Sequence, residues 1–326
     1  MNNPEKIVCF HLNQLGDLMF TLPALYNLRH HFPKARIVSV ARSAHRELLT
    51  LTGLVDNVLE RPYGPWSAKV RLALKLRRER FDIAVLFSMS TESAILAAVA
   101  GPKAKVGFRG PGLTYRVKKF GPPSISNSLR LVEAIGCPIV KNDYVGLIKL
   151  TEAERQKASD LLSSAGLPKF ANYAVLAPGS TREIKQWTHE GFVSLASLLH
   201  SEFGFASVIV GAERDRIIEQ SNGAIVDLLG KTSLADLAAI LERAKVFVGV
   251  DSGVMHLAAA MGVPVVALFG PTRHDLTGPL GNRNRIVTAG VPCAPCMKTS
   301  CNDRICMRNI TVEKVVEAVG ECLREI

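Results

Sequence analysis

The chain has few aromatic residues and no long uninterrupted apolar run. Phe, Tyr and Trp make up 6% of its 326 residues and do not interleave with basic residues, which argues against a platform that stacks single-stranded nucleic acid. The first twenty residues contain no sustained apolar stretch, and the most apolar later segment, 257–269, is interrupted by Gly262 and Pro264. We therefore expect neither a secretory signal nor a membrane-spanning helix.

Two patterns of common cofactor sites are also missing. No D-x-D sequence occurs in the chain, so an acidic metal-carrying pair of the usual kind is absent, and we expect no metal and no cofactor. After the first predicted strand, "LNQLGD" supplies one glycine where a dinucleotide-binding fingerprint needs G-x-G-x-x-G. This absence disfavours an NAD-dependent oxidoreductase.

The amino-acid composition is typical of a globular protein with a basic net charge. Hydrophobic residues make up 48% of the chain and charged residues 21%, and the length suffices for two domains with separate cores. The formal net charge is +11, and nearly all of it lies in residues 61–120, where 13 Lys and Arg stand against three acids. The basic character is therefore concentrated in one segment.

This basic segment contains a predicted helix, "WSAKVRLALKLRRERF". Helical spacing places Arg71, Lys75 and Arg78 on one stripe. The opposite arc carries apolar residues, namely Val70, Leu72, Ala73, Leu74 and Leu76. The stripe is either the solvated face of a helix packed on a sheet or a surface that attracts phosphorylated lipid headgroups or nucleic acid.

Short buried strands alternate with helical stretches along the whole chain. "KIVCFHL", "ARIVSV", "NVLE", "DIAVLF" and "AKVGF" are typical of such strands, and the pattern restarts with "YAVLAPG", "ASVIVGA", "KVFVGV" and "VPVVALFGP". Between the two sets, "TEAERQKASDLLSSAG" opens with a capping box that indicates a helix start. The alternation predicts an α/β protein with two doubly wound parallel sheets and a domain boundary within 140–170.

Ligands of doubly wound sheets bind at the carboxyl ends of the strands. Four stretches at predicted strand ends carry polar or glycine-rich chemistry: 11–25, 177–187, 210–215 and 248–272. In the last one, the predicted strand Val246–Val250 runs into Asp251, Ser252 and Gly253, and an apolar helix follows. The free N–H groups of that helix turn form an anion site suited to a diphosphate, and His256 lies one turn further on.

Simpler interpretations of these residues stay open. Asp251 or Ser252 can serve only as a helix N-cap, and His256 can be a partly buried core histidine. Asp17, which follows Gly16 in "HLNQLGDLMFTLPAL", can likewise be the N-cap of a helix over 18–31.

Three stretches together resemble a known family. "GDLMFTLPAL", "PGSTREIKQW" and "DSGVMHLAAAMGVPVVALFGPT" are similar, in this order, to the signature regions of the bacterial lipopolysaccharide heptosyltransferases, glycosyltransferase family nine. The resemblance implies a GT-B architecture, in which two Rossmann-like domains face a central cleft. The acceptor domain would span 1–150 and the nucleotide-sugar donor domain 151–310, with a helix at 311–326 that crosses back to the first domain.

The resemblance also implies an activity and a site. Family members transfer heptose from ADP-heptose to the inner core of lipopolysaccharide, a lipid A–Kdo type acceptor, with inversion and without a metal. Asp17 matches the catalytic base, and Lys185 matches a lysine that binds the donor phosphates. The other donor-binding matches are Ser180, Thr181, Glu213, Asp251, Ser252, Gly253 and His256. Inverting transfer needs a base for the acceptor hydroxyl and positive potential for the departing diphosphate, which these residue types can supply.

The implied partners are an ADP-sugar and an anionic, lipid-linked oligosaccharide, with no nucleic acid. We expect a cytoplasmic enzyme in peripheral contact with the inner membrane, held there by Arg71, Lys75, Arg78 and the lysines of "RVKK", Lys118 and Lys119. Two alternatives remain: a relative that uses another nucleotide sugar or acceptor, and a non-catalytic basic adaptor for membranes or nucleic acid. The adaptor hypothesis leaves Asp17 and Lys185 without a purpose.

Four of the seven cysteines cluster near the end of the chain. "CAPCMKTSCNDRIC" places them at Cys293, Cys296, Cys301 and Cys306, with one C-x-x-C pair rather than two. They are either reduced thiols in a packed loop or a metal or redox site. The sequence decides neither their role nor the oligomeric state.

Overall fold

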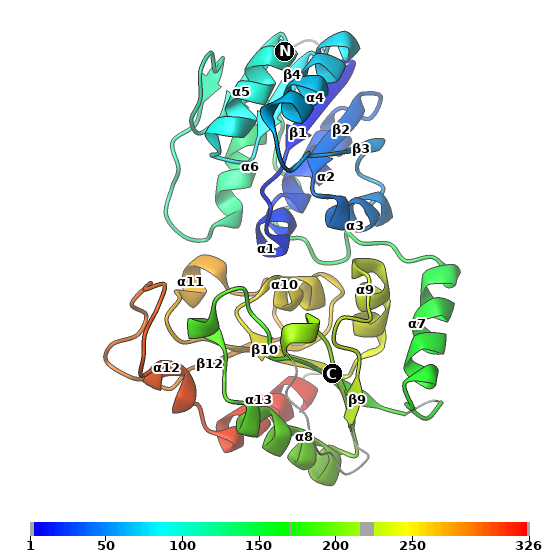
Figure 1. Cartoon of the computed structure of the whole chain (residues 1–326), viewed down its shortest axis with the longest axis vertical. Helices are drawn as coiled ribbons and strands as arrows, with labels where there is room; N and C mark the ends of the chain where they lie inside the picture. Colours follow the sequence, from blue (N-terminus) through cyan, green and yellow to red (C-terminus); the bar gives the residue numbers. More distant parts are fainter. Residues whose placement is uncertain (1–2, 170, 216–224, 325–326) are drawn as a thin grey trace. The chain divides into compact units, whose positions relative to one another are not determined.

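The computed structural model describes residues 3–169, 171–215 and 225–324. The chain divides into two compact units, Met1–Lys149 and Leu150–Ile326, so the boundary falls one residue before the one expected from the sequence. In its described part each unit is built on a six-stranded, all-parallel sheet with helices on both faces (Figure 1).

The first sheet has its switch point between the strands β1 and β4. The chain first builds strands to one side of β1 and then returns to its other side. Every predicted strand of this half is present, and the short β6 is an addition that the sequence did not indicate. The spatial order is β3 (Asn57–Glu60), β2 (Arg36–Ala41), β1 (Lys6–Phe10), β4 (Ile83–Leu86), β5 (Ala104–Gly107) and β6 (Tyr115–Arg116).

Helices cover both faces of this sheet. They are α1 (Leu15–Met19), α2 (Leu22–His31), the 3₁₀ helix η1 (Ser43–His45), α3 (Arg46–Leu51), α4 (Trp66–Glu79), α5 (Thr91–Ala100) and α6 (Ile125–Glu133). On one face α4 and α5 pack together over Val8 and Phe10 of β1, and on the other α2 packs on α6. Alternate residues of β1 thus enter two cores, as expected for a sheet buried on both sides.

The helix predicted over 18–31 is in fact two helices, and Asp17 is not its N-cap. Helix α1 begins at Leu15 after the N-cap Gln14, so Asp17 lies in its first turn. Pro23 explains the break: inside a continuous helix it would remove a backbone hydrogen bond, whereas in the first turn of α2 it costs none.

The apolar arc predicted for the basic helix is only partly buried. Ala73 and Leu76 of α4 are buried against the sheet side, but Val70 and Leu74 are exposed. The buried stripe is narrower than predicted because α4 packs mainly on its neighbour α5. The exposed pair therefore forms part of the protein surface.

The second sheet repeats the topology of the first, with its switch point between β7 and β10. Strand β10 spans the residues predicted for it, and all five of its residues are buried, as are those of β7. Two edge strands, β9 and β12, were not predicted. The spatial order is β12 (Asn284–Val287), β11 (Val265–Leu268), β10 (Val246–Val250), β7 (Tyr173–Ala177), β8 (Ala206–Ile209) and β9 (Ile225–Asp227).

The helices of the second unit begin with α7, where Thr151 and Glu154 form the predicted capping box. These helices are α7 (Glu152–Ser164), η2 (Glu183–Lys185), α8 (His189–Phe203), η3 (Glu213–Asp215), α9 (Leu234–Arg243), α10 (Gly253–Ala260), α11 (His274–Thr277), α12 (Ile305–Arg308) and α13 (Val312–Arg324). Across residues 3–169, 171–215 and 225–324, none of the helices has the length and hydrophobicity that a bilayer span requires.

The helix expected over 311–326 is present as α13 (Val312–Arg324). Helix α13 belongs to the second unit, where it packs on α8 and on strands β10, β11 and β12. Its buried residues Val315 and Val319 join the core of that unit, which explains the packing. Residues 325–326 lie outside the described part of the chain.

Candidate functional site

The switch point of the second sheet gathers two of the four stretches singled out in the sequence, 177–187 and 248–272. The loops after β7 and β10 leave the sheet on adjacent strands, and the loop after β11 leaves on the next one. Crevices at such points are where doubly wound sheets bind ligands. The chemistry of the second unit is therefore best sought around residues 178–187, 251–256 and 269–272.

An ion pair joins the loops after β7 and β10. Lys185 Nζ lies 2.6 Å from Asp251 Oδ2, and the side chains are only 18% and 8% exposed. The hydroxyl of Thr272, in the loop after β11, donates to the same oxygen at 2.7 Å. A half-buried ammonium is thus fixed at the carboxyl ends of the central strands, where it can attract an anion.

His256 lies fully buried behind this pair. Burial is the main effect and lowers the pKa of its imidazole to about 4. The Asp251 carboxylate raises this pKa, and the Lys185 ammonium lowers it. The ring is therefore neutral near pH 7, with one N–H donor and one acceptor nitrogen. The structure brings the predicted residues Lys185, Asp251 and His256 together, although they come from separate parts of the chain.

The N-terminus of α10 adjoins the ion pair. Ser252 is the N-cap residue, but its side chain makes no capping hydrogen bond. Its Oγ is shielded from solvent and has no hydrogen-bond partner within the described ranges. First-turn N–H groups, which begin here at Gly253, have no partner inside a helix. The interpretation of Asp251 or Ser252 as nothing more than a cap is therefore wrong, because neither side chain caps α10.

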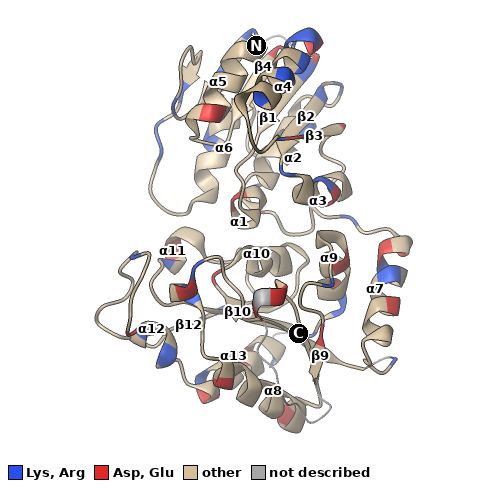
Figure 2. Ribbon diagram, in the orientation of Figure 1, with Lys and Arg blue, Asp and Glu red and all other residues tan. Residues whose placement is uncertain are grey.

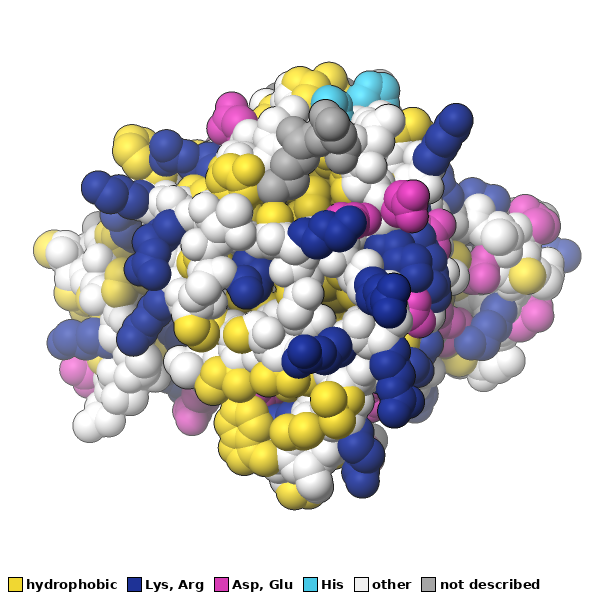
Figure 3. Space-filling view, turned by 90° about the horizontal axis from the view of Figure 1, so that it is seen from above, with side chains coloured by type: hydrophobic (Ala, Val, Ile, Leu, Met, Phe, Trp, Pro, Cys, Tyr) yellow, Lys and Arg dark blue, Asp and Glu magenta, His cyan; other side chains and the backbone are white. Residues whose placement is uncertain are grey.

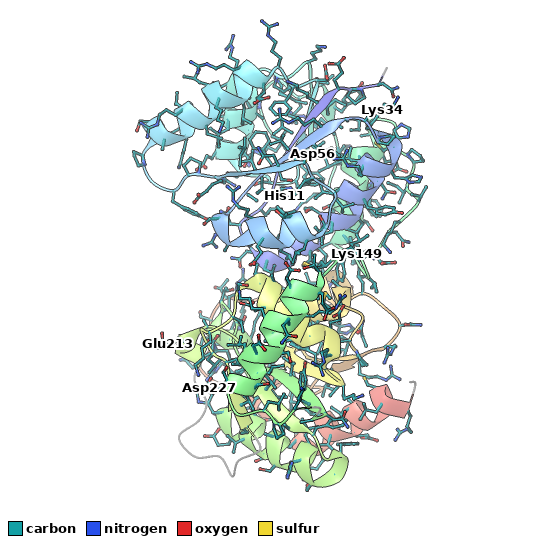
Figure 4. All side chains as sticks on the ribbon, turned by 90° about the vertical axis from the view of Figure 1, so that its right-hand side faces the viewer. His11, Lys34, Asp56, Lys149, Glu213 and Asp227 are labelled. Carbon is teal, nitrogen blue, oxygen red and sulfur yellow. The ribbon has the colours of Figure 1, made fainter. Side chains whose placement is uncertain are left out.

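The loop after β7 touches the loop after β8. The Asp215 carboxylate occupies the space that a side chain at position 179 would need. A Cβ on Gly179 would lie 1.9 Å from Asp215 Oδ2, so this close approach requires glycine. Ser180 is half-buried and Thr181 is exposed on the same loop. Exposed Glu213 begins η3 and packs against Gly230, on the side of the unit that also carries Asp227 (Figure 4).

The switch point of the first unit carries Asp17. This half-buried carboxylate lies in the first turn of α1, which follows the loop after β1. His11, the first residue after β1, is buried in the interior of this unit (Figure 4). Burial, with a smaller effect from His45, lowers the pKa of His11 to about 3, so the ring is neutral.

Hydrogen bonds fix the orientation of His11. Thr21 Oγ1 donates to the Leu18 carbonyl at 2.7 Å, so it accepts from His11 Nδ1 at 3.0 Å. His11 Nε2 then accepts from the Ser39 hydroxyl at 2.9 Å. This chain of bonds ties β1, β2 and the turn between α1 and α2 into one frame, which positions the helix that carries Asp17.

A charged cluster that sequence reasoning missed braces the same loop. Arg61, buried at the end of β3, donates to Glu92 Oε1 at 3.1 Å and to the His11 carbonyl at 3.4 Å, and Lys69 Nζ lies 2.8 Å from Glu92 Oε2. Burial raises the pKa of Glu92, but hydrogen bonds from Lys69 and Arg61 outweigh it and hold that pKa below its usual value. No local pattern marks these residues, because they meet only through the sheet.

Thr272 was missed as well, although its motif was recognised. It ends "FGPT", and its bond to Asp251 is visible only in the fold.

The predicted basic residues separate into two groups: Arg71, Lys75 and Arg78 are exposed along α4, and Lys118 and Lys119 are exposed after the edge strand β6.

The cysteines are all free thiols. Cys306 is buried and Cys296 half-buried, whereas Cys293 and Cys301 are exposed. Backbone N–H groups of Arg304 and Asp303 that hydrogen-bond Cys301 lower the pKa of its thiol. Within the described ranges no three His, Cys, Asp or Glu side chains are grouped so as to hold a metal ion.

Comparison with known proteins agrees with this architecture. A model of glycosyltransferase family 9 (heptosyltransferase) matches residues 69–305. Lipopolysaccharide heptosyltransferase 2 of Salmonella typhimurium is 26% identical over 320 residues, which cover 86% of this chain and 87% of that protein. The solved ADP-heptose lipopolysaccharide heptosyltransferase II of E. coli has a TM-score of 0.82 at 23% identity and covers 98% of this chain and 99% of its own. A family 9 glycosyltransferase from Veillonella parvula has a TM-score of 0.89 at 23% identity, with coverage of 99% and 98%.

Two parallel six-stranded sheets of this topology, matched over nearly their whole length by solved family 9 glycosyltransferases, define a GT-B glycosyltransferase fold. The chain belongs to glycosyltransferase family 9, the heptosyltransferases. The α/β fold class and the family expected from the three signature stretches are thereby confirmed.

Proposed function

We propose that this protein transfers heptose from ADP-heptose to the inner core of lipopolysaccharide, with inversion at the anomeric carbon. The family match and the names of its relatives support the sugar, the donor and the acceptor. The single observation that carries the donor site is the pair of Lys185 and Asp251, held at the switch point beside the start of α10.

In this proposal the donor diphosphate binds at the second switch point. The Lys185 ammonium and the first N–H groups of α10 supply positive potential, and the Ser252 hydroxyl supplies a further donor. Asp251 and Thr272 hold Lys185 in place through one shared oxygen. Ser180 and Thr181 flank the phosphates, Glu213 contacts the ribose, and neutral His256 supports the loop without adding charge.

Asp17 acts as the general base. It accepts the proton of the acceptor hydroxyl while that oxygen forms a bond to the anomeric carbon and the bond from that carbon to the diphosphate breaks. ADP departs with its extra negative charge against Lys185 and the α10 N-terminus, which stabilise the transition state. A displacement in one step inverts the anomeric configuration. We place the reaction at the cytoplasmic face of the inner membrane, where the lipid-linked acceptor is anchored.

The decisive test is a thermal-shift titration with ADP, UDP and GDP, followed by transfer from ADP-heptose to a lipid A–Kdo acceptor. We expect ADP to raise the melting temperature most, and NMR of the product to show inversion. Preferential stabilisation by UDP or GDP would point to a relative that uses another nucleotide sugar. No stabilisation by any of the three, with no transfer, would leave a non-catalytic adaptor as the better explanation.

A further inference from the structure

Helix α4 presents an apolar stripe to solvent. Trp66, Val70 and Leu74 are 51%, 43% and 46% exposed. They are spaced four residues apart, so they lie one above another on the same side of the helix. Tyr63, just before the helix, is exposed as well. Single exposed apolar residues are common on proteins, but a row of three on one helix is a surface that favours an apolar partner.

A basic stripe runs beside the apolar one. Arg71, Lys75 and Arg78 are exposed along the adjacent side of α4. The helix contains five Lys and Arg and a single acid, Glu79, which pairs with Lys6 and Arg36 (Figure 2). In the space-filling view of Figure 3, Lys and Arg side chains stand out from a surface that also exposes groups of apolar side chains. The outer side of α4 is thus amphipathic and positively charged.

The inner side of α4 already has its partners. Ala73 and Leu76 are buried in the core shared with α5, and Lys69 pairs with Glu92 of that helix at 2.8 Å. Turning the helix to bury the apolar stripe would expose this core and break the pair. The stripe is therefore a fixed feature of the folded unit.

We propose that the outer side of α4 docks on an anionic lipid bilayer, with Trp66, Val70 and Leu74 inserted among the acyl chains and Arg71, Lys75 and Arg78 against lipid phosphates. Helices that lie in a membrane interface have this combination of an apolar face, aromatic residues and flanking cations. Nucleic acid would use the basic stripe and leave the apolar stripe exposed to water. A second copy would bring two basic stripes together, which their like charge disfavours.

This surface goes beyond the proposed transfer reaction, since it uses neither the donor nor the acceptor site. Its test therefore measures binding alone. The chain supplies its own reporter: of its two tryptophans, Trp187 is 4% exposed and Trp66 is the one at the surface. Vesicles of phosphatidylcholine with phosphatidylglycerol should shift the Trp emission to shorter wavelength and protect it from iodide quenching. Pure phosphatidylcholine should do so much less, and Trp66→Phe should abolish the change.

Paired variants separate insertion from charge attraction. Val70→Ser with Leu74→Ser should weaken vesicle binding about five- to thirtyfold at every salt concentration, because inserted apolar area is lost. Arg71→Gln, Lys75→Gln and Arg78→Gln together should weaken it on the order of a hundredfold at low salt, and less at high salt where charges are screened. Val140→Ser alters an exposed apolar residue elsewhere in the same unit and should leave binding unchanged.

Several outcomes would overturn the proposal. If the serine pair binds vesicles like the parent, the contact is electrostatic only and there is no insertion. A blue shift that grows with protein concentration in the absence of vesicles would identify a second copy as the occupant. Binding to duplex DNA or RNA without binding to anionic vesicles would identify nucleic acid. All α4 variants should retain the parental rate on a deacylated, water-soluble acceptor, so failure here is distinct from failure of the proposed function.

Discussion

The two switch points have the same topology and different electrostatics. Both lie between the first strand of a six-stranded parallel sheet and the strand that returns to its other side. Both have a buried histidine behind the loop, His11 in the first unit and His256 in the second, whose pKa burial lowers far enough to keep the ring neutral. The first presents a carboxylate, Asp17, and the second an ammonium, Lys185, held by Asp251.

This difference indicates that the topology of the sheet fixes where the site lies, whereas the residues of the loops determine the sign of its charge. A neutral histidine can hold either loop because it offers two hydrogen-bonding atoms without altering the local potential. Deprotonating a hydroxyl needs a base, whereas holding a diphosphate needs positive charge. Four perturbations test whether the two switch points divide the work in this way.

The largest effect is expected at the first switch point. Asp17→Asn removes the proposed base with little change in shape, so kcat should fall about 10²- to 10⁴-fold, while ADP binding and the melting temperature stay near parental values. Steady-state kinetics and thermal shift with ADP measure the two. Glu47→Gln is the matched control, since Glu47 is also an acid in the first turn of a short helix of this unit. Transfer by Asp17→Asn at close to the parental rate would mean that another group is the base.

At the second switch point, Lys185→Ala should lower ADP affinity and kcat together. A charge-assisted hydrogen bond contributes about 1.5–3 kcal/mol, so the loss should be roughly ten- to a hundredfold. Calorimetry with ADP and kinetics on the same samples would measure it. Lys245→Ala is the control, because exposed Lys245 precedes the amino end of β10, opposite Asp251.

A second variant separates binding from folding. Lys185→Ala leaves the Asp251 carboxylate buried without its cation, which is destabilising. Adding Asp251→Asn should restore much of the melting temperature but not the ADP affinity. If ADP affinity is unchanged in Lys185→Ala itself, the assignment of the donor site is wrong.

The buried histidines predict a pH dependence of stability. The folded pKa values of His11 and His256, about 3 and about 4, lie below the ordinary value of 6.5. The unfolded chain therefore takes up protons first as the pH falls. The stability they give is complete above about pH 6.5 and is lost as the pH falls, down to about pH 4 for His256 and about pH 3 for His11, at about 1.4 kcal/mol per pH unit for each histidine.

Urea unfolding across this pH range measures the prediction. His256→Gln should reduce the slope of the unfolding free energy against pH by about 1.4 kcal/mol per pH unit, which corresponds to the uptake of one proton. His189→Gln, at the exposed first residue of α8, should leave the slope unchanged. Equal slopes for parent and His256→Gln would show that His256 does not stay neutral in the folded protein.

The smallest effect is expected from Thr272→Val, which removes one hydrogen bond to Asp251. Such a bond contributes about 0.5–1.5 kcal/mol, so ADP affinity should fall roughly two- to tenfold. Thr272→Ser keeps the hydroxyl and should bind ADP like the parent. A valine variant with parental affinity would mean that Lys185 alone holds Asp251 in place.

Much of the fold could be predicted because its signals are local. The nine predicted strands are all present, since short apolar runs between turn residues mark buried strands; of the nine, only β3 is a partly exposed edge strand. The edge strands β6, β9 and β12 were missed because they are short and partly exposed, so their sequences lack that apolar run. The break between α1 and α2 was marked locally by Pro23 and was overlooked.

By itself the sequence determined the alternation of strands and helices, the loops that carry polar residues and, through three signature stretches, the family. These depend on residues close together in the chain. Only the tertiary structure decided that Lys185 meets Asp251, 66 residues away, and that Arg61 meets Glu92. It alone decided that Val70 and Leu74 face solvent. Ion pairing and burial depend on what the rest of the chain packs against a residue, and that environment exists only once both sheets have formed.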